Sequence, residues 1–84
     1  MPKVKIYSTT WCQYCKLEKA YLDEKGIKYD YVQVDLDPKE AEEFQQVSGG
    51  QQGVPFTLVT KDNGEKVGIL GFNKPQLNEV LGLA

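Results

Sequence analysis

Hydrophobic residues recur along this chain with two periods, one typical of strands and one typical of helices. Four short stretches are rich in Val, Ile, Tyr or Phe, so each predicts a strand, and the first of them alternates apolar with charged positions. These stretches are Lys3–Ser8, Ile27–Val34, Phe56–Thr60 and Glu65–Leu70. Lys61–Gly64 is a turn sequence that joins the last two in a hairpin. The second stretch carries apolar residues on both faces, which predicts a strand covered on both sides.

The first helical stretch, Gln13–Lys25, is followed by Gly26, which is suited to the left-handed conformation that ends helices. Its apolar positions predict the face that packs on the sheet. This face consists of Leu17, Ala20 and Tyr21, with Cys15, Lys19 and Leu22 beside it. Lys16 and Lys19 are interpreted as solvated charges. The pattern does not explain why a glutamate stands at position 18, and we expect Glu18 to face solvent.

The second helix has the clearest start signal. Asp37 is suited to the N-cap, Pro38 to the first helical position and Glu40 to a capping box, so we expect a helix that ends at about Val47. Its acidic residues are expected on the outer, solvated face: Glu40, Glu42 and Glu43. Gln45–Gly53 is rich in Gln, Gly and Ser and is interpreted as a solvated loop.

A third helix closes the chain. Asn73 and Gln76 predict a capping pair around Pro75, and the helix is expected to end near Gly82. The order of elements is therefore β-α-β-α-β-β-α in one domain, residues 1–84. Two strand–helix units predict parallel strands joined by right-handed crossovers, and the hairpin adds an antiparallel strand. The fold class is α/β, with a four-stranded mixed sheet flanked by three helices.

Composition excludes several functions. The chain has 84 residues, 40% of them hydrophobic, and a formal net charge of −2, which is typical of one compact domain. All ten basic residues are lysines, so the bidentate arginine contacts that read bases and phosphates are missing, and we expect no nucleic-acid partner. No apolar run is long enough to span a membrane and no signal-peptide pattern is present, so a cytoplasmic location is expected. We also expect a monomer.

The only two cysteines, Cys12 and Cys15, are the candidate reactive groups. Their spacing places both side chains on one face of a first helical turn. If Cys12 lies where the helix begins, unpaired backbone N–H groups and the helix dipole favour its thiolate, which is the nucleophilic form. The loop after the first strand ends at Cys12, and ligands bind such sheets beyond the carboxyl ends of the parallel strands. The sequence therefore predicts a dithiol redox site.

Other interpretations of these residues remain open. The cysteines are alternatively two buried hydrophobic residues or half of a zinc site, but a structural zinc needs about four ligands and the chain has neither histidine nor a second cysteine pair. Trp11 and Tyr14 either fill the core or form an exposed apolar rim, which we favour, whereas the two places are evenly balanced for Phe72. Without histidine, the general base for thiol exchange is solvent, a carboxylate or none.

Three motifs resemble the glutaredoxin branch of the thioredoxin superfamily. They are Trp11-Cys12-Gln13-Tyr14-Cys15, Val54-Pro55 and Gly71-Phe72, which follow the order of that family and cover essentially the whole chain. The lysines after the second cysteine and the late Gly-Phe step resemble glutaredoxin-like and NrdH-type redoxins. The Trp11-Cys12 and Gly49-Gly50 steps are also similar to those of mycoredoxins. The resemblance implies a thioredoxin-like (glutaredoxin) fold.

The same resemblance implies roles for these residues. Cys12 would attack a substrate disulfide, and Cys15 would resolve the resulting mixed disulfide. The Val54-Pro55 bond would be cis and would turn the backbone of Val54 toward an extended substrate segment. The other implied substrate-binding residues are Trp11, Gln13, Tyr14, Gln52, Pro55, Gly71 and Phe72. The protein is then an enzyme without a bound cofactor, a thiol–disulfide oxidoreductase for protein disulfides, with ribonucleotide reductase as the leading candidate acceptor.

The chain departs from the family pattern at several positions. Gln13 stands where glutaredoxins usually have proline, and Thr9 stands where glutathione-binding members often have lysine. Asn73 and Lys74 stand where those members often have acidic residues for the glutathione amine, although Gln51 and Gln52 still offer hydrogen bonds. The departures favour thioredoxin reductase as the electron donor. Glutathione as donor, and a module that holds a bridging iron–sulfur cluster, are the alternatives.

Overall fold

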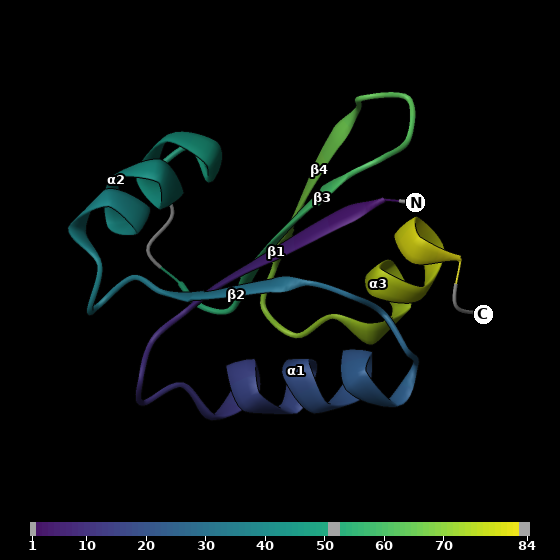
Figure 1. Cartoon of the computed structure of the whole chain (residues 1–84), viewed down its shortest axis with the longest axis horizontal. Coiled ribbons are helices and arrows are strands. Elements are labelled where there is room, and N and C mark those ends of the chain that lie inside the picture. The colour runs from purple at the N-terminus through teal and green to yellow at the C-terminus, as the bar shows by residue number, and fades with distance from the viewer. Residues whose placement is uncertain (1, 51–52, 83–84) are drawn as a thin grey trace.

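In the computed structural model, which describes residues 2–50 and 53–82, four strands form one sheet that lies between helices (Figure 1). The elements are β1 (Lys3–Ser8), α1 (Gln13–Glu24), β2 (Asp30–Gln33), α2 (Pro38–Val47), β3 (Phe56–Thr60), β4 (Lys66–Leu70) and α3 (Lys74–Leu81). The predicted order of elements, the α/β class and the mixed sheet are confirmed.

The strand order in the sheet is β2-β1-β3-β4. β1 and β2 are parallel, whereas β3 is antiparallel to both β1 and β4. The predicted parallel crossover therefore holds for the first strand–helix unit only. Phe56 pairs with Tyr7, so after α2 the chain enters the sheet again at the end where β1 finishes, and β3 runs back along β1.

The second strand is shorter than the predicted Ile27–Val34. Its backbone N–H at Ile27 donates to the carbonyl of Leu22 at 2.9 Å, so the first predicted strand residue completes the end of α1 instead. Gly26, with φ of 70°, supplies the left-handed turn at this point, as predicted. Pairing with β1 then covers only Asp30 to Gln33.

The two faces of the sheet carry separate hydrophobic cores. On one face α1 and α3 pack on a cluster of Val4, Ile6, Leu22, Val59, Ile69 and Leu77. On the other face α2 packs on a cluster of Tyr7, Phe44 and Phe56. The rings of Tyr7 and Phe44 stack with centroids 5.4 Å apart. Gly68 makes room for Phe56, because a Cβ atom on this glycine would lie 2.7 Å from the ring.

The N-cap residues of α2 and α3 are those predicted, but the Glu40 side chain pairs with Lys5 instead of closing the expected capping box. The Asp37 side chain accepts from the backbone N–H of Lys39 at 3.1 Å, and that of Asn73 accepts from the N–H of Gln76 at 3.2 Å. Gly82 ends α3 in the left-handed conformation. These bonds satisfy N–H groups that a helix start leaves unpaired, so each helix begins where the sequence predicts.

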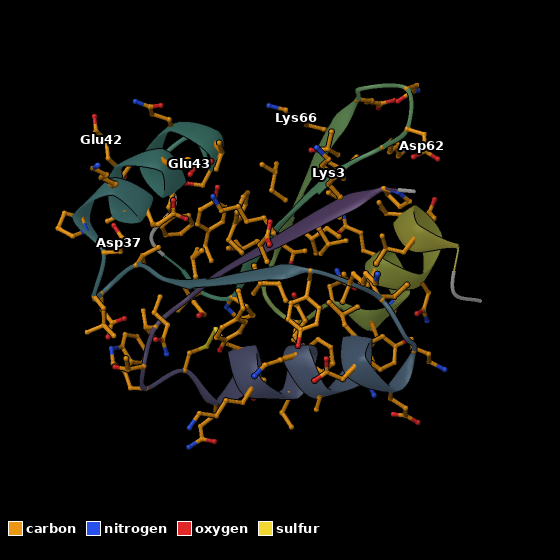
Figure 2. All side chains as sticks on the ribbon, in the orientation of Figure 1. Lys3, Asp37, Glu42, Glu43, Asp62 and Lys66 are labelled. Atoms are coloured by element: carbon orange, nitrogen blue, oxygen red, sulfur yellow. A yellow bond between two sulfur atoms is a disulfide. The ribbon has the colours of Figure 1, made fainter. Side chains whose placement is uncertain are left out.

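The prediction that the three glutamates of α2 share its outer face is wrong for two of them. Glu40 and Glu43 turn toward the sheet, where their carboxylates lie 2.9 and 2.8 Å from Nζ of Lys5 in β1. Glu42 alone is exposed, and Figure 2 shows it pointing away from the strands, while Glu43 lies on the side of α2 nearer to them. The lysine on the α2 face of β1 attracts the two inner carboxylates.

The predicted packing face of α1 is confirmed in part and wrong in part. Cys15, Tyr21 and Leu22 pack on the core side, whereas two other residues of the predicted face do not. Leu17 is 53% exposed and Ala20 is exposed, whereas the buried residues of the helix are Cys15, Glu18 and Leu22. The helix is rotated so that the cysteine, rather than the most hydrophobic stripe, lies on the sheet. Glu18 is fully buried by this rotation, and its interpretation as a solvent-facing residue is wrong.

Candidate active site

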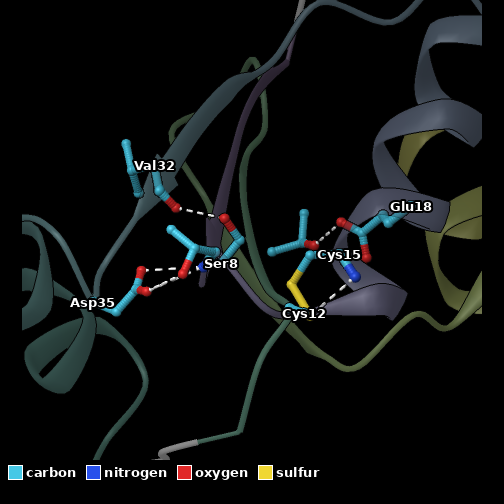
Figure 3. Close-up of a disulfide and its surroundings, with 8 residues drawn as sticks. Ser8, Cys12, Cys15, Glu18, Val32 and Asp35 are labelled. Atoms are coloured by element: carbon cyan, nitrogen blue, oxygen red, sulfur yellow. Dashed lines mark hydrogen bonds between the residues drawn. A yellow bond between two sulfur atoms is a disulfide. The ribbon is translucent and has the colours of Figure 1, made fainter.

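A disulfide joins Cys12 and Cys15 at the junction of β1 and α1 (Figure 3). Their Cα atoms lie 5.3 Å apart. Cys12 has extended backbone angles and is the N-cap of α1, and its Sγ accepts the backbone N–H of Cys15 at 3.0 Å. The predicted position of Cys12 at the start of the helix is confirmed. When the pair is reduced, this N–H and the helix dipole favour a thiolate on Cys12.

The two sulfur-bearing residues differ in depth. Cys12 is 5% exposed and Cys15 is fully buried. The backbone N–H of Cys12 donates to the carbonyl of Thr9 at 3.3 Å, which closes the turn before the helix. A molecule that approaches from solvent therefore reaches Cys12 first, while Cys15 lies one turn into α1 and contacts the protein interior.

An exposed carboxylate holds the loop that carries Cys12. The backbone N–H of Thr10 donates to both carboxylate oxygens of Asp35 at 3.2 Å, and the Thr10 hydroxyl donates to Asp35 Oδ2 at 2.6 Å (Figure 3). These bonds lower the pKa of Asp35 below its usual value. The hydroxyl of the buried Ser8 donates to the carbonyl of Val32 at 2.8 Å. Sequence reasoning missed Asp35 because nothing local relates it to Thr10.

Around the disulfide, the residues between and before the cysteines face solvent. Trp11 is 71% exposed and Tyr14 is 65% exposed, and Gln13 is exposed as well. The interpretation of the two aromatic residues as an exposed apolar rim is confirmed, and core filling is wrong. Phe72 is half-buried and packs edge-on to Tyr21, with ring centroids 5.9 Å apart, so it belongs to the core.

The other two predicted motifs, Val54-Pro55 and Gly71-Phe72, lie side by side. The Val54–Pro55 peptide bond is cis, as the resemblance implied. Pro55 is buried, and its carbonyl accepts the backbone N–H of Gly71 at 2.8 Å. Val54 is half-buried and packs against the core on the α2 side. Gln52 lies outside the described residues, and the substrate-binding roles of all these residues stay predictions.

A buried carboxyl group lies behind the disulfide, and sequence reasoning missed it. Glu18 accepts a short hydrogen bond from the hydroxyl of Thr57 in β3, and its other oxygen, Oε1, has no hydrogen-bond partner among the described residues. Burial raises the pKa of Glu18 from 4.5 to about 7, although the Thr57 bond acts in the opposite direction. The spacing along α1 could have indicated this burial, because Cys15, Glu18 and Leu22 fall on one face of the helix.

Within residues 2–50 and 53–82, no group of three or more His, Cys, Asp or Glu side chains is arranged to hold a metal ion. The search for membrane spans over the same residues finds no helix with the length and apolar character to cross a bilayer.

Comparison with known proteins places the chain among redox proteins. Residues 4–62 match the glutaredoxin family model. A glutaredoxin-like 8.6 kDa protein in the rubredoxin operon of Clostridium pasteurianum is 41% identical over 93% of this chain and 96% of its own length. Methanoredoxin from Methanosarcina acetivorans is 31% identical, with a TM-score of 0.73 over 95% of this chain and 84% of its own. NrdH-redoxin from Escherichia coli shares the fold, with a TM-score of 0.73 over 93% of each chain and 22% identity.

Proposed function

The chain belongs to the glutaredoxin family, and from this membership we propose that it is an electron carrier that reduces protein disulfides through Cys12 and Cys15. One observation carries the proposal: the two cysteines are within bonding distance, with Cys12 on the solvent side at the helix start and Cys15 buried behind it. This is the arrangement that a nucleophile and a resolving thiol require.

The reaction proceeds in two exchanges. The Cys12 thiolate attacks one sulfur of the substrate disulfide, the substrate S–S bond breaks, and one substrate thiolate leaves. The Cys15 thiolate then attacks Cys12 Sγ, which forms the Cys12–Cys15 disulfide and releases the second substrate thiolate. Two electrons pass from the dithiol to the substrate, and a separate reductant returns the oxidised chain to its dithiol form.

We propose a thioredoxin reductase as that reductant. Two features support it over glutathione. Thr9, at the position where glutathione-binding members often have lysine, is only 7% exposed. Lys74, at the start of α3, has the wrong charge for the glutathione amine and lies over the rings of Tyr21 and Phe72, 5.2 and 5.6 Å from their centroids.

The acceptor is a protein disulfide rather than a small one. The exposed side chains of Trp11 and Tyr14 place an apolar rim beside Cys12, and burying aromatic side chains of this kind stabilises protein contacts. Ribonucleotide reductase is the leading candidate acceptor, because the motifs of the chain resemble those of NrdH-type redoxins. The proposed location is the cytoplasm, where dithiols of this kind are kept reduced.

The donor is tested by following NADPH oxidation with insulin as the disulfide substrate. One reaction contains thioredoxin reductase, and the other contains glutathione with glutathione reductase. We expect turnover with thioredoxin reductase and little with glutathione. Efficient turnover with glutathione and none with thioredoxin reductase would overturn the donor proposal while leaving the dithiol chemistry intact.

The roles of the cysteines are tested by single substitutions. Cys12→Ser is expected to abolish insulin reduction without loss of fold, because the attacking sulfur is gone. Cys15→Ser is expected to accumulate a mixed disulfide at Cys12, which mass spectrometry detects as an adduct that dithiothreitol removes. Full activity toward protein disulfides in the Cys15 variant, without an adduct, would contradict the resolving role.

A further inference from the structure

We propose that Glu18 is the proton acceptor and donor for the Cys15 thiol, so that a buried carboxyl group drives the resolving step of the exchange. This inference rests on the proposed dithiol function and adds a residue to it. The chain has no histidine, and among the described residues Glu18 is the one Asp, Glu or Lys side chain that is buried.

The positions of the two residues on α1 bring them together. Glu18 follows Cys15 by three residues, which places their Cβ atoms about 5–6 Å apart on one helical face. Helical side chains also lean toward the N-terminus of their helix, which is the direction of Cys15 from Glu18. Figure 3 shows the Glu18 side chain extending from the helix toward Cys15.

The hydrogen bonds of Glu18 leave one oxygen for the proton. Thr57 of β3 holds Oε2, whereas Oε1 is buried and has no partner among the described residues. A buried oxygen without a hydrogen-bond partner destabilises the folded protein by about 1–3 kcal/mol. Accepting the proton of the Cys15 thiol would remove this penalty. Thr57 thereby fixes the carboxyl group with its second oxygen unoccupied.

The electrostatic surroundings suit proton exchange near neutral pH. Burial raises the pKa of Glu18 to about 7. Titratable side chains on this face of the sheet include the two cysteines, Tyr21 of α1, and Tyr29 and Tyr31 near β2, with Asp23 of α1 accepting a hydrogen bond from Tyr29. The nearby cations lie over aromatic rings: Lys19 over Tyr31, and Lys25 and Lys74 over Tyr21. Burial and the Thr57 hydrogen bond shift the pKa of Glu18, and no cation among the described residues holds this carboxyl group in its ionised form.

The proton follows the electrons in both directions. In the resolving step the Glu18 carboxylate takes the proton of the Cys15 thiol, the Cys15 sulfur forms its bond to Cys12 Sγ, and the bond from Cys12 Sγ to the substrate breaks to release a thiolate. When a reductant thiolate later attacks Cys12, Cys15 leaves as a thiolate and recovers the proton from the Glu18 carboxylic acid. Charge, electrons and protons balance in each step.

The resolving step is measured with an aromatic disulfide that releases a coloured thiolate. The reduced protein releases one equivalent when Cys12 attacks the reagent and a second when Cys15 resolves the adduct, and stopped-flow absorbance separates the two. In Glu18→Gln we expect the second step to slow about 100-fold near pH 7, the low end of what a positioned acid–base group contributes. The first step, which uses Cys12 only, stays within a factor of about two and shows that the variant is folded.

The pH profile distinguishes proton transfer from a structural role. In the wild type the second step accelerates as pH rises through about 7, with ionisation of Glu18. In Glu18→Gln this acceleration moves to the higher pH at which the Cys15 thiol ionises by itself. Glu18→Asp restores part of the rate, and Glu24→Gln, which removes an exposed carboxylate at the far end of α1, changes neither step.

The outcomes separate this inference from the proposed function. If the wild type releases no second equivalent, the dithiol function itself is wrong. If both equivalents are released and Glu18→Gln leaves the rate and pH profile of the second step unchanged, the dithiol function stands and the role of Glu18 is refuted. A uniform slowing of both steps in Glu18→Gln, with an unchanged pH profile, refutes it as well, because that pattern reports altered structure rather than proton transfer.

Discussion

Glutamate side chains pack against both faces of this sheet, but the groups that they contact differ in charge. On the α2 face Glu40 and Glu43 meet Lys5, at 2.9 and 2.8 Å, and remain partly exposed. On the α1 face Glu18 is fully buried and meets a hydroxyl, that of Thr57. Both partners come from central strands, so the difference lies in the charge of the partner.

The partner decides the ionisation of each carboxyl group. The hydrogen bond from Lys5 lowers the pKa of Glu43, which therefore stays ionised through the neutral range. Burial raises the pKa of Glu18 to about 7, because a neutral hydroxyl does not compensate for lost hydration. A carboxylate that is paired with a cation contributes to structure alone, whereas an unpaired one beside a reactive thiol is able to exchange a proton.

The largest expected effect is on the pH dependence of stability at Glu18. Its folded-state pKa of about 7 lies above the usual 4.5, so the stability that its proton provides is complete below pH 4.5 and is lost as pH rises through 7. The free energy of unfolding of the oxidised protein is expected to fall by about 3 kcal/mol across this range. In Glu18→Gln the fall disappears, and the variant becomes the more stable protein at pH 8.

This is measured by urea unfolding of the oxidised proteins between pH 4 and 8. Glu24→Gln is the control, because it removes an exposed carboxylate from the same helix and should leave the wild-type pH dependence in place. Parallel curves for the wild type and Glu18→Gln would mean that Glu18 titrates in the fold as it does in the unfolded chain.

A smaller effect is expected from removal of the hydroxyl partner. In Thr57→Val the hydrogen bond to Glu18 is lost, which costs about 1 kcal/mol at pH 5 and about 2 kcal/mol at pH 8, since bonds to charged groups are the stronger ones. The bond lowers the pKa of Glu18, so its loss moves the stability change to higher pH. Thr57→Ser should restore both values, and Thr60→Val, at the end of the same strand, serves as a control. A penalty that is equal at both pH values would contradict this assignment.

The smallest effect is expected on the α2 face. Lys5→Gln removes a partly exposed ion pair and should cost less than about 1 kcal/mol. Because the folded-state pKa of Glu43 is lowered, its contribution is present above about pH 4.5 and is lost as pH falls through the lowered pKa. The cost of Lys5→Gln should therefore vanish in acid and shrink in 1 M salt, unlike the effect of Glu18→Gln. Unfolding free energies at low and high salt check this, and a salt-independent cost would remove the contrast between the two faces.

The features that could be predicted from the sequence are those whose causes are local. The caps at Asp37 and Asn73, the left-handed stop at Gly26 and the hairpin turn at Lys61–Gly64 depend on residues within a few positions of each other. The position of Cys12 at the helix start depends on the same kind of signal. Resemblance to a family added the cis bond before Pro55, which a single sequence does not indicate.

The prediction for α1 failed in part because it chose the packing face of the helix from hydrophobicity alone. Leu17 makes its own stripe the more apolar one, yet Leu17 faces solvent and Glu18 is buried. A glutamate on the sheet side is tolerated only because Thr57, 39 residues away along the chain, donates a hydrogen bond to it. The prediction for Glu40 and Glu43 failed in the same way, because their partner Lys5 is also distant in sequence, 38 residues from Glu43.

The amino-acid sequence by itself therefore determined the order of elements, the caps of the helices and the dithiol at the start of the first helix, since neighbouring residues control backbone conformation and capping. Only the tertiary structure decided the direction of β3, the rotation of α1 and the ionisation of Glu18. These depend on which distant groups meet when surfaces are buried, and desolvation and pairing energies exist only once the chain has folded.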